Sequence, residues 1–182
     1  NLILIIKIPE FFSCHKGVMR MGEGYMQQKG PFVGRAHQIK KRKKTYNDPR
    51  CPRCNSVIET CEHVLSCCEA GRVDCLQKSI NLLEEWLEES HTEQGLKECI
   101  VKFARGRGGF PMVLSAAEHG QDYHRMAVSQ DLIGWRRFME GMISKEMVEI
   151  QREHCGLEDV EITADRWAQG LITKLLEITH GQ

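Results

Sequence analysis

Four potential metal ligands lie within a stretch of 17 residues, and they constrain this chain more than any other feature does. Cys51 and Cys54 are separated by two residues, a spacing at which one tight turn presents both thiols on the same side. His63 and Cys67 are four positions apart and would share one face of a helix that Thr60 can cap. Because thiolates and imidazole are preferred zinc ligands, the pattern predicts a tetrahedral zinc site that joins the turn to the helix.

Other interpretations of these residues stay open. The four side chains could be ordinary buried thiols and a core histidine, or the first two cysteines could form a redox pair. No βαβ pattern surrounds them, which disfavours the redox pair. Cys61 and Cys68 lie off the helical face of His63 and would replace a ligand only in a distorted helix. A closed shell of four protein ligands leaves no position for water or substrate, so we expect a structural zinc rather than a catalytic one.

The charges of the chain are segregated along the sequence. Residues 1–56 contain 12 Lys or Arg and 3 Asp or Glu, whereas residues 57–100 contain 3 and 10. This asymmetry indicates a basic arm that binds a polyanion, attached to a body that does not. We predict sequence-independent, salt-sensitive contacts with the phosphates of RNA or DNA. The residues predicted to make them are Arg35, Lys40, Lys41, Arg42, Lys43, Lys44, Arg50 and Arg53. The alternative is a solvated linker.

Cysteine usage bears on the compartment. Five of the nine cysteines fall between Cys51 and Cys68, the total is odd, and no secretory signal is visible. These features favour metal-bound thiols in a reducing intracellular compartment, the nucleus or the cytoplasm, over a disulfide framework. The apolar opening segment, residues 1–8, is shorter than the roughly 20 residues of a membrane span. We interpret it as an element of an upstream domain and expect no membrane partner.

The remainder of the chain has the periodicity of helices. Leu76, Ile80, Leu83 and Leu87 form one apolar stripe, and no alternating strand pattern of any length is present. Further helices are predicted near residues 93–103, 122–141, 144–156 and 163–178. Trp86, which flanks the first stripe, is expected in the core. Trp135 and Trp167 of the later helices are expected there too, together with Leu132 and Met139.

Several residues predict where these helices begin and end. Ser90 and Glu93 have the spacing of a capping box, and Gly156 stands where a helix would stop. The fold class expected is mainly α: a small zinc-bound turn-and-helix element, then a bundle of four or five helices, with a loosely ordered basic N-terminal arm. We divide the chain into an upstream remnant with a basic linker (1–46), a zinc-binding element (47–75) and a helical bundle (76–182).

The zinc motif resembles that of a known family. Cys51-Pro-Arg-Cys54, followed by Glu59-Thr60-x-Glu62-His63-Val64-Leu65-x-Cys67, is similar to the zinc-binding region downstream of the reverse transcriptase domain in retrotransposon-encoded, non-LTR-like proteins. Residues 130–141 are similar to a motif farther downstream in some of them. The resemblance spans about residues 50–155, and Cys68 is additional to the family pattern. It implies a fragment of a mobile-element polyprotein that partners the upstream polymerase domain and handles RNA or DNA template.

No catalytic constellation accompanies the motif. The sequence lacks the polymerase Asp-Asp pair, a convincing set of RNase H carboxylates and a restriction-like endonuclease pattern. His119, Asp122 and His124 could form a second metal site or a His–Asp pair, but a polar loop or helix start is favoured because no nucleophile is evident beside them. We therefore expect a non-catalytic segment. The alternative is a zinc-stabilised protein–protein interaction module with an acidic helical surface.

Overall fold

The computed structural model describes residues 48–158 and 162–181, and these ranges fold into helices without a β-strand. The mainly α class is thereby confirmed. The predicted basic arm, residues 1–46, lies outside the described residues. In chain order the helices are α2 (Cys61–Ser66), α3 (Ala70–Glu89), α4 (Gln94–Arg105), α5 (Met112–Ala116), α6 (Gln121–Ile133), α7 (Trp135–Met139), α8 (Lys145–Glu158) and α9 (Ala164–Gly181).

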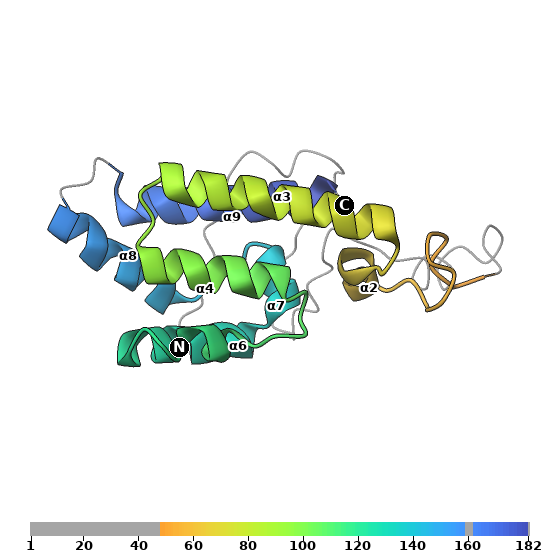
Figure 1. Cartoon of the computed structure of the whole chain (residues 1–182), viewed down its shortest axis with the longest axis horizontal. Helices are drawn as coiled ribbons and strands as arrows, with labels where there is room; N and C mark the ends of the chain where they lie inside the picture. The colour runs from red at the N-terminus through yellow and green to blue at the C-terminus, as the bar shows by residue number, and fades with distance from the viewer. Residues whose placement is uncertain (1–47, 159–161, 182) are drawn as a thin grey trace, which may run out of the picture.

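The five longer helices form the bundle. The first and the last of them, α3 and α9, run side by side, and α4 packs on α3 on the side toward α6 (Figure 1). Helix α8 contacts α6 and α9, while the short α5 and α7 fill the connections on either side of α6. Helix α2 lies at one end of the bundle, next to the start of α3 (Figure 1). This end of the bundle is therefore where the candidate ligands meet the rest of the fold.

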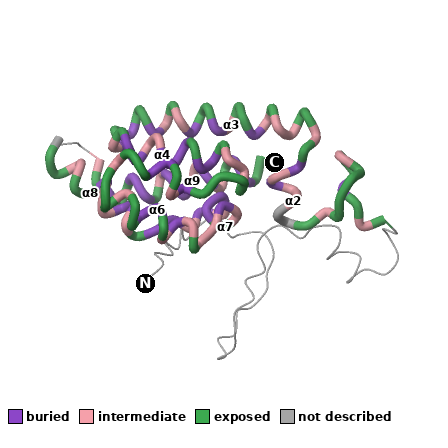
Figure 2. The backbone as a smooth tube through the Cα atoms, turned by 60° about the horizontal axis from the view of Figure 1, so that its bottom comes forward, coloured by how far each residue is buried: buried purple, intermediate pink, exposed green. Residues whose placement is uncertain are grey.

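The helices enclose one continuous hydrophobic core, and their buried faces point toward one another (Figure 2). The stripe of α3 from Leu76 to Leu87 is fully buried, as its periodicity predicted. Trp135 and Trp167 are buried, and Trp86 is partly buried against the same cluster. Removal of each large apolar side chain from water stabilises the fold by about 1.5–3 kcal/mol. Leu65 brings α2 into this core and so anchors the candidate metal element.

The helix predicted over residues 122–141 is interrupted. Gly134 has a φ of 87°, a left-handed conformation that ends α6 at Ile133 and lets α7 start in a new direction. The apolar stripe predicted along this helix is therefore not continuous. Trp135 and Met139 enter the core, but Leu132, expected beside them, is 78% exposed.

Two helix boundaries also differ from the prediction. The backbone N–H of Ser90 is still bonded to the carbonyl of Trp86, so Ser90 ends α3 and cannot start a capping box. Glu93 instead caps α4 itself, accepting the N–H of Leu96 at 2.7 Å. Gly156 does not stop α8, which continues to Glu158.

Candidate metal centre

The first two cysteines are presented by a tight turn in a short antiparallel ribbon. The N–H of Cys51 donates to the carbonyl of Val57 at 2.8 Å, next to a bridge between Arg50 and Ile58. The N–H of Asn55 donates back to the carbonyl of Cys51, also at 2.8 Å, and closes the turn. Because Cys54 lies inside this closed turn, its thiol and that of Cys51 are fixed relative to each other.

The other two candidate ligands belong to one short helix, His63 within α2 and Cys67 at its C-terminal end. Thr60 is the N-cap of α2, and its hydroxyl accepts the N–H of His63 at 3.0 Å, as the sequence predicted. Cys67 follows the last residue of α2 directly and is its C-cap. Leu65, between the two ligands, is buried in the core of the bundle. Burial of this one side chain thus sets the position of both His63 and Cys67.

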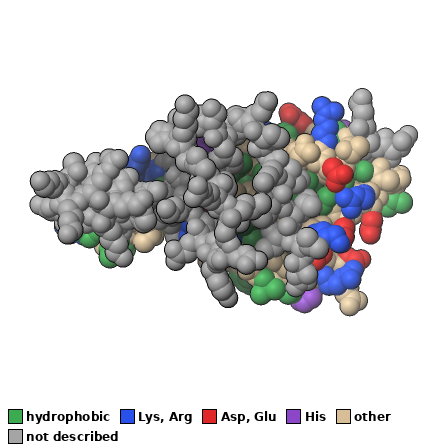
Figure 3. Space-filling model, turned by 180° about the vertical axis from the view of Figure 1, so that it is seen from behind, with side chains coloured by type: hydrophobic (Ala, Val, Ile, Leu, Met, Phe, Trp, Pro, Cys, Tyr) green, Lys and Arg blue, Asp and Glu red, His purple; other side chains and the backbone are tan. Residues whose placement is uncertain are grey.

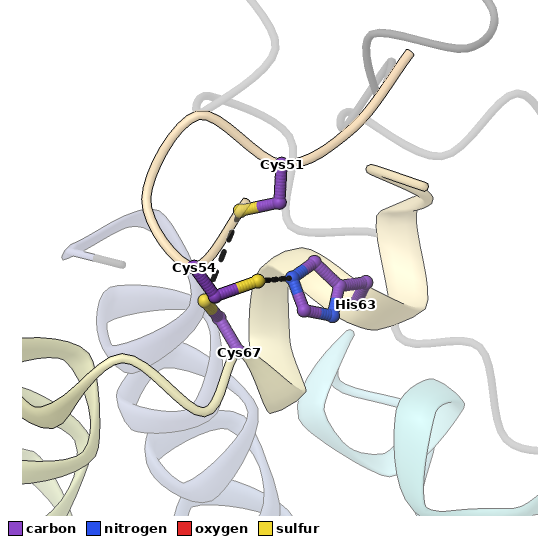
Figure 4. A group of neighbouring side chains, drawn as sticks. All are labelled: Cys51, Cys54, His63 and Cys67. Atoms are coloured by element: carbon purple, nitrogen blue, oxygen red, sulfur yellow. Dashed lines mark hydrogen bonds between the residues drawn. The ribbon is translucent and has the colours of Figure 1, made fainter. Parts of the chain in front are cut away.

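The structure brings the four side chains together (Figure 4). Their ligand atoms all lie within 4.8 Å of one another. The Sγ atoms of Cys51 and Cys67 are 3.8 Å apart, and Cys54 Sγ is 3.3 Å from Nε2 of His63. A disulfide would need about 2.0 Å. With metal–ligand bonds of about 2.0–2.3 Å, the ligand atoms of a tetrahedral site lie about 3.3–3.8 Å apart. The group therefore has a geometry that could hold a metal ion.

The electrostatic surroundings of the thiols differ. Backbone hydrogen bonding from Ser56, and to a smaller extent from Val57, lowers the pKa of Cys54 to about 6, against the opposing effect of burial. Burial raises the pKa of Cys67. Metal binding requires thiolates, and a bound cation stabilises them. The protein backbone thus already favours one ionised ligand, while the buried thiol of Cys67 is a group that a cation would help to ionise.

Two arginines near the centre were not among the residues that the sequence predicted for this site. Nη2 of Arg107, in the loop between α4 and α5, donates to the carbonyl oxygen of Cys67 at 2.6 Å. Arg72, in the first turn of α3, is half-buried; burial and the charge of Arg53 lower its pKa, while the nearby thiols, including those of the candidate centre, oppose this. Arg107 lies 40 positions from its acceptor and belongs to no motif, so no sequence signal could have found it.

The remaining candidates near the motif occupy different places. Cys68 is exposed and is not part of the group of four, and the side chain of Cys61 lies outside the described residues. Arg50 and Arg53 are both exposed on the ribbon, and the guanidinium of Arg50 is bonded to Asp48 at 2.8 Å. Arg35 and the run from Lys40 to Lys44 lie outside the described residues.

The polar residues from His119 onward pair with neighbouring side chains. Nε2 of His119 is 3.5 Å from a carboxylate oxygen of Glu98, and its ring packs against Tyr123. Asp122 pairs with Arg125 on the surface of α6. Within residues 48–158 and 162–181, the only group of three or more side chains that could share a metal ion is the one around Cys51.

Comparisons with known proteins add no relative. No protein-family model matches the chain, and neither the curated proteins nor the solved structures contain a significant match. In the described part of the chain, no helix combines the length and the apolar character that crossing a bilayer requires. The geometry of the residues themselves therefore carries the functional argument.

Proposed function

We propose that this chain is a zinc-stabilised, non-catalytic segment that assists the binding of RNA or DNA template. In this proposal it belongs to a retroelement reverse transcriptase protein of the non-LTR type and works beside the upstream polymerase domain, inside a reducing compartment. The observation that supports it best is the convergence of Cys51, Cys54, His63 and Cys67 on one point.

Zinc is the metal that this donor set favours. Three thiolates and one imidazole are soft or borderline ligands, and their number fills a tetrahedral shell. Bound there, zinc would supply cross-linking rather than chemistry, because four protein ligands leave no open position. The ribbon and α2 contribute only Leu65 to the hydrophobic core. An element so small gains much of its folding free energy from the metal.

The nucleic-acid part of the proposal rests on where the positive charge lies. Arg50 and Arg53 are exposed on the ribbon, directly after the basic run of the sequence. An open groove beside the centre is lined by Arg50 and by Val57 and Ile58, which are 48% and 52% exposed. At the end of the bundle away from α2, by contrast, acidic and basic side chains are mixed (Figure 3). In this proposal the polyanion contacts the basic run together with Arg53, and Arg50 would exchange its ion pair with Asp48 for a phosphate.

The metal is tested first. The chain purified under reducing conditions should contain one zinc per molecule, measured by elemental analysis. Cys54→Ser should lose the metal, and Cys68→Ser, which changes an exposed thiol outside the group, should keep it. A folded parent chain without zinc, in a preparation to which zinc was supplied, would contradict the proposal.

Nucleic-acid binding is tested by fluorescence anisotropy with labelled RNA and DNA at several salt concentrations. Affinity should fall steeply with salt, and replacement of Lys40 to Lys44 by glutamine should reduce both affinity and the salt dependence. The matched control also replaces five cations, all of which form ion pairs on the bundle surface: Arg105, Arg125, Lys145, Arg152 and Lys174. Equal loss in the control would mean that only the total charge matters.

A second candidate function, the binding of a partner protein, is supported by an acidic surface on the bundle. On α3, Glu84, Glu85, Glu88 and Glu89 line a shallow surface shared with Lys97 of α4. Leu82, on the same helix, is 64% exposed. Under this alternative, the acidic surface of the bundle binds a basic partner protein and zinc only stabilises the module. A chain that binds zinc but neither RNA nor DNA at low salt would favour it.

A further inference from the structure

Arg107 makes an unusual contact with the candidate centre. It lies two residues beyond the end of α4 and has a φ of 50°, a left-handed conformation that non-glycine residues rarely adopt. Its guanidinium lies against the carbonyl of Cys67, with Nη2 2.6 Å from the oxygen. This is a charge-assisted hydrogen bond between the bundle and the backbone of a candidate ligand. The bond fixes the backbone of Cys67 relative to the bundle.

The guanidinium of Arg107 is only partly satisfied by this contact. Its Nε atom is shielded from solvent and has no hydrogen-bond partner in the described part of the chain, and the same holds for Nε of Arg72. Both side chains are half-buried, but an unpaired N–H that is shielded from water is costly on a cation unless negative charge lies close by. For Arg107 the candidate centre can supply that charge, because its Nη2 already contacts the backbone of Cys67.

The charge of a loaded centre fits this need. Three thiolates and a neutral imidazole around a divalent cation carry a net charge of about −1. Arg107 reaches the backbone of Cys67 from the loop after α4, a part of the bundle that contributes no ligand. Groups of this kind, which hold or neutralise the ligands without touching the metal, tune affinity in known metal sites.

We propose that Arg107 is a positioning residue of the metal centre. It fixes the backbone of Cys67 on the bundle. The inference rests on the proposed function in one respect, that the centre binds zinc. Its consequence is that the affinity for zinc depends on the α4–α5 loop, which contains none of the ligands.

The test measures zinc affinity of the full chain by competition with a chelating indicator under reducing conditions. Arg107→Met should weaken zinc binding by about 10- to 100-fold. Arg107→Lys, which keeps a donor and a charge, should recover most of the affinity. The matched control is Arg105→Met, because Arg105 lies two residues away, at the end of α4, and pairs with Glu84 on the surface. Its affinity should equal that of the parent.

A second measurement separates positioning from general stability. Urea unfolding of each variant is compared with zinc and with excess chelator. Positioning predicts that Arg107→Met destabilises the zinc-loaded chain more than the chelated chain, with a difference that matches the loss of affinity. The thiolate-to-cobalt absorption of the Co²⁺-substituted variant should also change.

The outcomes are distinct. If the parent chain binds zinc and Arg107→Met binds it as tightly, the positioning role is wrong and the proposed function stands. If Arg107→Met weakens the chain equally with and without metal, the contact with Cys67 only supports the fold and the inference is also wrong. A parent chain that binds no zinc contradicts the proposed function itself.

Discussion

The indole Nε1 of Trp167 donates a hydrogen bond to the hydroxyl of Thr92 at 2.8 Å, in the buried interior and across 75 positions of sequence. The bond joins α9 to the short connection between α3 and α4. Both groups are shielded from water, so neither can find a solvent partner if the other is removed.

Thr92→Val should therefore lower the free energy of unfolding by about 1–3 kcal/mol, because it leaves the buried N–H of Trp167 unpaired while keeping the size of the side chain. Urea unfolding followed by tryptophan fluorescence measures the change. Thr173→Val is the matched control, since the Thr173 hydroxyl bonds only to the carbonyl of Gln169 on its own helix. The control should stay within about 0.5 kcal/mol of the parent, and an equal loss in both would show that the buried bond to Trp167 is not the cause.

Gly170 allows α9 to approach α3 closely. A Cβ added there would lie 2.5 Å from Cζ2 of Trp86, closer than packed atoms can come. We expect Gly170→Ala to destabilise the fold by about 1–3 kcal/mol, although alanine is the better helix former.

Gly156 also lies in a helix, but there we expect a change to alanine to stabilise the fold. A Cβ at Gly156 meets no atom within 4 Å, and the residue lies inside α8. This change should stabilise the chain by about 0.5–1 kcal/mol. Thermal unfolding of the two variants checks both signs, and a loss at both positions would contradict the packing explanation.

Glu93 predicts a dependence of stability on pH. Burial raises its pKa, but hydrogen bonds from Tyr123 and from the N–H groups of Leu96 and Gly95 outweigh burial, so the pKa is lowered. The ionised form therefore adds stability above the unfolded-state value of about 4.3, and this contribution is lost as the pH falls through the folded-state value. Glu93→Gln should cost about 1 kcal/mol at pH 7 and less near pH 3.

Urea unfolding with chelator present at both pH values measures the effect of Glu93→Gln without any contribution from metal release. Glu89→Gln, at an exposed position near the end of α3, is the control and should show little effect at either pH. A cost that is the same at both pH values would mean that the charge of Glu93 is not involved.

Removal of the metal should loosen one part of the chain. The core cluster is built almost entirely by α3 to α9, with Leu65 as the contribution of the zinc element. We expect excess chelator to increase amide hydrogen exchange strongly in residues 49–68 while α4, α6 and α9 remain protected. Added zinc should restore the protection. Equal exposure of the bundle would show that the metal holds the whole fold.

The sequence was most informative where structure is local. The stripe of α3, the Thr60 cap and the clustering of the four candidate ligands follow from spacing within a few turns of chain. Each depends on one periodicity or on one hydrogen bond between residues that are close in sequence, so the residue types and their spacing are enough to predict it.

The differences arise where a residue has two possible local roles or a distant partner. Gly134 can continue a helix or end it, and only the packing of Trp135 into the core favours the break. Glu93 begins α4 with the help of Gln151, which accepts its N–H at 2.9 Å and donates to the carbonyl of His91. Gln151 lies 58 positions away, beyond the reach of any pattern argument.

The pairing of α3 with α9 sets an order of events during synthesis. The chain is made from its N-terminus, so the face of α3 that packs on α9 stays uncovered until α9 has been translated. All four candidate ligands precede α3, so they leave the ribosome before the helices of the bundle. The metal can therefore be captured while most of the bundle does not yet exist, and the loaded element can fold before the bundle that follows it.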